Sequence, residues 1–340
     1  IILAQANHLY LLDVISKSQK EIKLEIPTDY KFDPIVHKTY SANINKLAIA
    51  PNGKLSALVI RGEIFVRKTE KDKKRTVNIS KSEYRDRTPT WLNDSSLLFI
   101  SDREGQNDLY EVHSGDDNES NLFKTLKHKI TRLTNTKENE SNPVLSPDGK
   151  SIAFNRGRGK LIVASVNSDG KLSNEKVLQD GWATSNGVSW SPDSKWLAYS
   201  LTDLDFNREI YIHKADNSIK PVNISMHPKQ DRNPIWSPDG KKLMFSSNRN
   251  NNDYDVWFTW LNKEDWEKTT QDWEEDTDDL PESKTDKSPN KKDENGKQED
   301  EVPEVIIDFD DIHRRQVQVT SFVGGEQGRF FSKDCKTIYY

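Results

Sequence analysis

The sequence predicts an all-β chain that folds as a β-propeller of four-stranded antiparallel blades. Three observations lead to this prediction: a turn motif recurs six times, short alternating runs flank the copies, and most copies lie between 40 and 55 residues apart. Such a period, with four strands in each unit, is typical of propeller blades. The copies occupy residues 50–54, 92–96, 146–150, 191–195, 237–241 and 332–336.

The chemistry of the motif predicts a tight turn between two strands. Two copies read Ser-Pro-Asp-Gly-Lys, and a third reads Ser-Pro-Asp-Ser-Lys. Proline sets φ for the second turn position, the Asp side chain accepts hydrogen bonds from nearby backbone, and glycine adopts a positive φ without strain. The copies at 92–96 and 332–336 lack the proline or the glycine. Their blades are still expected, but they match the repeat less closely.

The runs around each turn predict the four strands of a blade. Apolar or aromatic ends precede the turns at 143–145, 188–190 and 234–236, and alternating runs follow at 151–154, 196–199 and 242–245. Alternation places one face of each strand in a core. Third strands are expected near 62–66, 108–110, 208–212 and 253–257, and polar outer strands near 76–80, 130–134, 221–225 and 317–320.

The spacing of the turns sets the expected domain organisation. Between their third residues, successive copies lie 42, 54, 45, 46 and 95 residues apart. We predict one propeller domain over 1–340, with complete blades at about 41–80, 81–134, 135–180, 181–226 and 227–321. Residues 1–27 and 322–340 would be partial blades. They either join as the split closing blade of a six-bladed ring, or belong to separate blades of a seven-bladed ring truncated here.

The long interval of 95 residues indicates an insertion in the fifth blade. Residues 274–302 hold 12 acidic residues and five lysines, a net charge of −7, which leaves +2 on the rest of a chain whose total is −5. This stretch has almost no aliphatic and no aromatic side chains, so we expect a disordered charged insertion. Just before it, residues 262–273 predict one short helix capped by Asn262, with Trp266 and Trp273 on a shared face.

Composition narrows the possible functions. The nearly neutral body lacks the concentrated basic face that nucleic-acid binding requires, and no apolar run approaches the ~20 residues of a membrane helix. The single Cys335 has no partner for a disulfide or metal cluster and is expected in a strand, buried or half-buried. The seven histidines show no zinc spacing, and no catalytic or phosphate-binding motif occurs. We therefore expect no cofactor, metal or catalytic residue in these residues.

Several short sequence motifs resemble those of known propeller families. The Ser-Pro-Asp-Gly-Lys turns and the Ser-Asp-Arg-x-Gly hairpin at 101–105 resemble the TolB-type, WD40-like repeat. The runs at 61–65, 84–91, 208–211, 253–258 and 305–315 resemble the second, seven-bladed propeller of bacterial tricorn-like serine peptidases. The resemblance covers most of the chain. No catalytic motif of that family falls within it, so no catalytic residue is carried over.

The resemblance implies a function for the chain. A non-catalytic propeller of a tricorn-like peptidase would act as scaffold and as gate or filter for peptide substrates, with PDZ and protease domains downstream in the same chain. The alternative is a TolB-like periplasmic propeller that binds proteins and has no associated enzyme. A third reading is the propeller of a prolyl-oligopeptidase-like enzyme. The family favours a periplasmic location, a cytoplasmic one stays open, and a homo-oligomer is a further possibility.

Arginines that recur near the blade edges are the candidate contact residues. Arg85, Arg87 and Arg232 are expected to line a channel that attracts peptide carboxylates, because guanidinium groups bind carboxylates bidentately. For these and for Arg103 and Arg249, the competing interpretation is ion pairs to Asp residues between blades. The Asp-rich turns around residues 102–108 and 253–255 are assigned to turn chemistry rather than to Ca²⁺.

Overall fold

The computed structural model describes residues 1–5, 8–24, 38–40, 42, 44–73, 75–167, 170–250, 252–278 and 302–340. It divides into two compact units, residues 1–43 and 44–340, which are described separately. Unit 1 is a three-stranded antiparallel sheet of β1 (Ile2–Gln5), β2 (His8–Leu12) and β3 (Gln19–Ile22) in that order. Because this sheet belongs to a unit of its own, the single domain and the split closing blade stay predictions.

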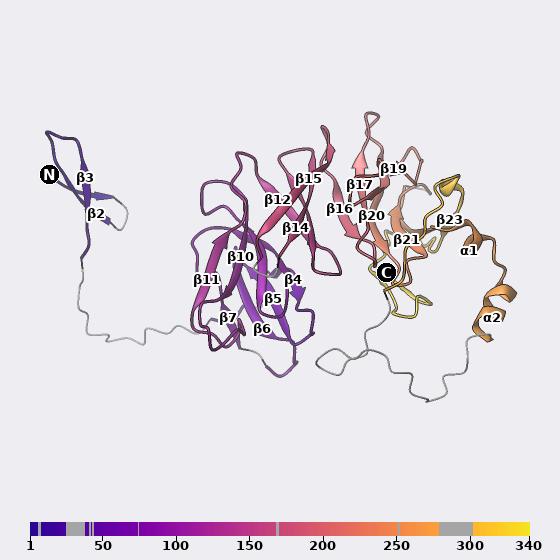
Figure 1. Ribbon diagram of the computed structural model, residues 1–340, viewed down its shortest axis with the longest axis horizontal. Coiled ribbons are helices and arrows are strands. Elements are labelled where there is room, and N and C mark those ends of the chain that lie inside the picture. The colour runs from indigo at the N-terminus through magenta and orange to yellow at the C-terminus, as the bar shows by residue number, and fades with distance from the viewer. Residues whose placement is uncertain are drawn as a thin grey trace. The chain divides into compact units, whose positions relative to one another are not determined.

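Unit 2 contains five four-stranded antiparallel sheets, each with its strands in sequence order and each within one predicted blade range (Figure 1). We number these sheets as blades 1 to 5. Blade 1 comprises β4 (Ile44–Ile49), β5 (Leu55–Ile60), β6 (Glu63–Lys68) and β7 (Thr76–Asn78). Blade 2 comprises β8 (Asp86–Trp91), β9 (Ser96–Ser101), β10 (Asp108–Ser114) and β11 (His128–Arg132).

The remaining three blades repeat this pattern. Blade 3 comprises β12 (Glu140–Leu145), β13 (Ser151–Arg156), β14 (Lys160–Val166) and β15 (Leu172–Asp180). Blade 4 comprises β16 (Asn186–Trp190), β17 (Trp196–Thr202), β18 (Arg208–Lys214) and β19 (Val222–Asn223). Blade 5 comprises β20 (Asp231–Trp236), β21 (Lys242–Ser247), β22 (Asp255–Trp260) and β23 (Gln316–Gln318).

The recurring turns join first and second strands as their chemistry predicts. In the turn at 146–150, Ser146 Oγ and the backbone N of Lys150 both donate to Asp148 Oδ1, at 2.5 and 3.0 Å. Gly149 has a φ of 70°, and Ser194 occupies the equivalent place at 59°. The side chain of one turn also accepts from the preceding turn, since Asp148 N donates to Ser194 Oγ at 3.1 Å.

Neighbouring sheets pack face to face and form the core. One buried cluster lies between each pair of consecutive blades, and the first strands of successive blades contact one another. Burying a large apolar side chain such as Phe154 or Tyr199 fully contributes about 1.5–3 kcal/mol. Successive sheets joined through shared cores are the arrangement of propeller blades. The predicted fold class, an all-β propeller of four-stranded blades, is confirmed.

The segment after β22 forms two helices where the sequence predicted one. Asn262 caps α1 (Lys263–Glu267) as expected, by accepting from Glu264 N at 2.8 Å. The chain then leaves helical geometry at Lys268, and α2 (Thr270–Asp278) starts anew. Thr269 and Asp272 exchange side-chain to backbone hydrogen bonds of 3.2 and 2.6 Å, a capping box that favours a second helix start.

The helix break has consequences for the two tryptophans and for the predicted insertion. Trp266 is 43% exposed, whereas Trp273 stacks on Trp260 at a ring separation of 5.6 Å, so the shared face is wrong. α2 includes residues 274–278 of the expected disordered insertion, and 279–301 lie outside the described residues. Both helices are too short to cross a bilayer, and no other helix in the described part of the chain could do so.

A final hairpin follows blade 5. β24 (Phe330–Phe331) pairs with β25 (Ile338–Tyr339) around the turn at 332–336, and the 3₁₀ helix η1 (Ile312–Arg314) precedes β23. Cys335 is half-buried as expected but lies in the turn at a φ of 57°, not in a strand. Its Sγ accepts from Asp239 N at 3.3 Å, which repeats the contact between the turns of blades 3 and 4.

A buried histidine makes the stability of blade 4 depend on pH. His213 is 0% exposed; its Nδ1 lies 3.3 Å from Tyr199 Oη and its Nε2 lies 2.9 Å from Asn217 Oδ1. Burial lowers the pKa of His213 from 6.5, although the Asn217 contact opposes the shift. The folded protein therefore binds a proton at this ring less readily than the unfolded chain does. Stability present above pH 6.5 is lost as the pH falls towards the folded pKa.

We expect His213→Gln to flatten the acid side of the stability profile. In the unsubstituted protein, protonation of this ring lowers the free energy of unfolding by up to about 1.4 kcal/mol per pH unit below pH 6.5. Urea unfolding of both proteins at pH 7.0, 6.0 and 5.5 measures the difference. Parallel profiles for the two proteins would show that His213 does not titrate differently in the folded and unfolded states.

Candidate functional site

The first strands of blades 2 to 5 share a bulge that shapes one end of unit 2. The register shifts in β8, β12, β16 and β20, and each shift contains a residue with positive φ. These residues are Thr88 at 47°, Asn142 at 51°, Gly187 at 61° and Asn233 at 54°. A bulge turns the preceding side chain away from the regular strand direction. Arg87 and Arg232, two predicted contact residues, hold this preceding position in β8 and β20.

A buried carboxylate precedes the bulge in three of these strands. Each accepts from an arginine at or just beyond the end of the second strand of the same blade: Asp86 from Arg103 at 3.0 Å, Glu140 from Arg156 at 2.9 Å and Asp231 from Arg249 at 3.0 Å. For Arg103 and Arg249, ion pairs between blades were the competing expectation. The pairs lie within a blade instead, because the antiparallel second strand returns to where the first begins. These three acids could have been found in the sequence because each begins a recurring acid-x-Thr/Asn-Pro motif.

Two arginines of these pairs also stack on aromatic rings. The guanidinium of Arg249 lies 4.6 Å from the Trp257 ring centroid, and that of Arg103 lies 4.9 Å from that of Tyr110. Stacking on aromatic faces and charge-assisted hydrogen bonds stabilise a partly buried guanidinium. The aromatic contacts therefore help to stabilise these buried ion pairs.

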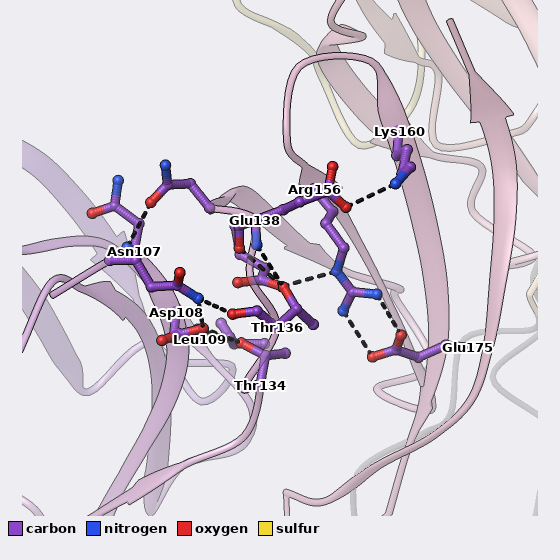
Figure 2. A network of polar contacts seen from close by, with 12 residues as sticks. Asn107, Asp108, Leu109, Thr134, Thr136, Glu138, Arg156, Lys160 and Glu175 are labelled. Atoms are coloured by element: carbon purple, nitrogen blue, oxygen red, sulfur yellow. Dashed lines mark hydrogen bonds and ion pairs between the residues drawn. The ribbon is translucent and has the colours of Figure 1, made fainter. Parts of the chain in front are cut away.

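Figure 2 shows how this polar layer connects blades 2 and 3. Arg156 donates to Glu140 and also to both oxygens of Glu175, at 2.7 and 3.1 Å. The Glu175 hydrogen bond is the largest influence that raises the pKa of Arg156, while burial raises the pKa of the Glu140 carboxyl. Asn107 N donates to Asn139 Oδ1 at 2.8 Å, which fixes one blade against the next.

Arg85 and Arg87 line one cavity between blades 1 and 2. It has a volume of about 370 Å³, and Arg61 and Lys46 also line it. The Arg61-Gly62 turn brings its arginine here because Gly62 packs against the backbone of Arg85. Arg87 has one weak partner, Asp102 at 3.7 Å, and no ion pair is found for Arg61 or Arg85 among the described residues. The cavity therefore carries excess positive charge.

Arg232 lies elsewhere, at the equivalent position between blades 4 and 5. Its guanidinium stacks on Tyr254, 3.9 Å from the ring centroid. The structure thus brings two of the three predicted contact residues together in one cavity and places the third at the corresponding strand position of another blade. No three His, Cys, Asp or Glu side chains gather as a metal site within the described ranges.

The chain is thus a β-propeller with an arginine-lined cavity between blades 1 and 2, and comparison with known proteins agrees with this class. No family model matches the sequence. A "Putative Tricorn-like protease C-terminal subunit" from Sulfurisphaera tokodaii is 25% identical over 263 residues, 73% of this chain and 27% of that protein. The "Protein TolB homolog" of Chlorobium chlorochromatii is 26% identical over 155 residues, 46% of this chain and 32% of that protein.

A further curated protein and a solved structure are also similar to this chain. The "Uncharacterized peptidase YuxL" of Bacillus subtilis is 29% identical over 170 residues, 49% of this chain and 22% of that protein. The crystal structure of the tricorn protease aligns with a TM-score of 0.56 and 16% identity, over 97% of this chain and 30% of that one. The matches span between 22% and 34% of the length of these curated relatives. The predicted similarity to TolB-like and tricorn-like β-propellers is confirmed.

Proposed function

We propose that this chain is a non-catalytic β-propeller segment of a tricorn-like serine peptidase, and that it acts as scaffold and as gate or filter for peptides. The observation that carries the proposal is the cavity lined by Arg61, Arg85 and Arg87. The nearby acid Asp86 is already neutralised by Arg103, so the excess positive charge remains available to a ligand. Peptides carry carboxylates, and arginine binds these bidentately.

Charge reversal tests the gating role. We expect the double variant Arg85→Glu, Arg87→Glu of the full-length protein to weaken binding of acidic peptides by about tenfold or more. The substitutions remove charge-assisted hydrogen bonds to the peptide carboxylates and replace them with repulsion between like charges. Peptide binding by calorimetry and kcat/KM for acidic and neutral peptide substrates measure the effect. Arg314→Gln, at an arginine whose side chain is 71% exposed and which pairs with Asp311, is the control. Unchanged binding and unchanged kinetics would remove the gating role.

A second candidate function is a TolB-like protein-interaction propeller without an enzyme. The similarity to TolB homologues over nearly half of the chain favours it. It predicts a stable protein partner that the double variant still binds, and no effect of that variant on peptide hydrolysis. Downstream PDZ and protease domains, a periplasmic location and homo-oligomer formation belong to these proposals and depend on which of them holds.

A further inference from the structure

Arg208 and Arg232 lie close together where blades 4 and 5 meet, and no ion pair is found for either among the described residues. Arg208 begins β18, and Arg232 stands before the bulge of β20. The chain joins the two strands here, since Arg208 N donates to Lys229 O at 3.2 Å and Arg208 forms an isolated bridge with Gln230. The Nε atoms of both arginines are buried, and neither has a hydrogen-bond acceptor among the described residues.

These two arginines differ from the other half-buried ones. Arg103, Arg132, Arg156 and Arg249 each contact a buried carboxylate within 2.5 to 3.0 Å. Arg208 and Arg232 instead repel each other. The pKa of Arg232 is lowered, mainly by burial and next by the nearby positive charge of Arg208. Since arginine stays protonated at neutral pH, the protein bears this repulsion in its free state. A buried cation without a partner is costly, so the arrangement favours an anion supplied from outside.

Blade 4 lacks the internal acid that would neutralise the pair. At the place where Asp86, Glu140 and Asp231 precede the bulges of their strands, blade 4 has Ser185. The Ser185 side chain is buried and its Oγ also has no partner among the described residues. The next carboxylate in the repeat, Glu209, accepts from Ser225 Oγ and from His227 N. Asp231 Oδ1 is also without a partner among the described residues, but this carboxylate is already ion-paired with Arg249. Blade 4 therefore supplies no carboxylate to Arg208 or Arg232.

The tyrosine under Arg232 adds one more donor. The guanidinium of Arg232 lies on the ring of Tyr254, and the Tyr254 hydroxyl is buried without a partner among the described residues. Three buried donor atoms without a partner among the described residues, two of them on charged side chains, thus lie in this region. Carboxylate oxygens are acceptors only, and arginine is the side chain best shaped to bind them in pairs.

An exposed aromatic pair lies near these arginines. Phe206 is 72% exposed and packs edge-on against Trp182 at a ring separation of 5.9 Å. Its carbonyl accepts from Gln230 Nε2 at 3.0 Å, so the loop carrying Phe206 is attached to the residue that bridges to Arg208. Phe206 also has a φ of 63°, which is strained for a bulky residue and is found most often at functional positions.

From these observations we propose that this site binds an acidic side chain of an extended peptide. Arg208, Arg232 and Tyr254 hold the Asp or Glu carboxylate, and a neighbouring apolar side chain of the peptide packs on Trp182 and Phe206. The assignment rests on the proposed peptide-binding function and specifies which peptides are selected. Charge complementarity identifies the acid, and the exposed aromatic pair identifies the apolar neighbour.

A matched set of peptides tests the proposal by calorimetry with the full-length protein. The probe is an acetylated, amidated hexapeptide with a central Glu-Phe pair, so its side chain is the only carboxylate. We expect replacement of that Glu by Gln, or of that Phe by Ser, to weaken binding about tenfold or more. Arg208→Gln and Arg232→Gln should weaken binding of the Glu-Phe peptide similarly and abolish its preference over the Gln-Phe peptide.

Other outcomes overturn the proposal in recognisable ways. No binding of the Glu-Phe peptide, or equal affinity for the Glu and Gln peptides, would end it. If the Gln peptide with a free C-terminus binds as tightly as the amidated Glu peptide, the ligand is a terminal carboxylate and the side-chain assignment is wrong. If Arg208→Gln weakens peptide binding while the double variant Arg85→Glu, Arg87→Glu does not, the result supports the site at Arg208 and Arg232 and contradicts the gating role of the cavity at Arg85 and Arg87.

Thermal unfolding separates binding from folding. Because the two arginines repel each other and have no carboxylate partner in the part of the chain that the structure describes, Arg208→Gln should leave Tm unchanged or raise it in the free protein. A clear fall in Tm would show that Arg208 has a structural role and would overturn its assignment to an external ligand. Arg314→Gln again serves as the exposed control for both measurements.

Discussion

Arg249→Gln is expected to lower the free energy of unfolding by about 3–5 kcal/mol, because it leaves the carboxylate of Asp231 buried without its charge partner. The Asp231 side chain is 0% exposed, and Arg249 is its closest cation, at 3.0 Å. The substitution also removes the stacked contact with Trp257 and the hydrogen bond from Arg249 Nε to Ser247 Oγ at 2.8 Å. Urea unfolding followed by circular dichroism measures the loss.

A double variant shows whether the unpaired charge causes the loss. Asp231→Asn combined with Arg249→Gln removes both charges, so it should recover a large part of the stability that Arg249→Gln loses. Arg314→Gln, at the exposed arginine paired with Asp311, should change stability by no more than about 0.5 kcal/mol. An equal loss in the single and double variants would attribute the effect to packing around Arg249 instead.

This ion pair illustrates what the sequence could and could not predict. The strands and turns were predictable because proline, aspartate and glycine act on their immediate neighbours, as the bonds around Asp148 and the positive φ of Gly149 show. The partner of Arg249 was not, because Asp231 lies 18 residues earlier and becomes its neighbour only through the register of β20 and β21. The recurring acid-x-Thr/Asn-Pro motif marks Asp231 as part of the repeat, but it does not reveal that this carboxylate is buried or which arginine it pairs with.

The candidate site divides in the same way. Sequence reasoning named Arg85, Arg87 and Arg232 from their repeated places near blade edges, and the common position of Arg87 and Arg232 reflects the bulge that precedes the apolar end of each first strand. It did not find Arg208, because only the contact between β18 and the start of β20 brings this residue close to Arg232. The break at Lys268 was missed because the second capping residue, Thr269, lies inside an otherwise helical pattern.

Contacts between blades depend on a tryptophan that the sequence marked only as an aromatic strand end. Trp190 at the end of β16 is 7% exposed, and its Nε1 donates to Val144 O of the preceding blade at 3.0 Å. Trp91 and Trp236 make the same bond to Ala48 and Ser189, at 3.1 and 3.2 Å. Each indole therefore fills the core between two sheets and also satisfies a carbonyl of the neighbouring first strand.

We expect Trp190→Ala to cost about 3–5 kcal/mol of unfolding free energy, since it opens a cavity between blades 3 and 4. Trp190→Phe retains most of the apolar volume but leaves the Val144 carbonyl without its donor, so about 1–2 kcal/mol should be lost. Trp266→Ala, at a tryptophan that is 43% exposed, is the matched control and should change stability by less than about 1 kcal/mol. Similar losses for Phe and Ala at position 190 would mean that the hydrogen bond, rather than the buried ring, holds the two blades together.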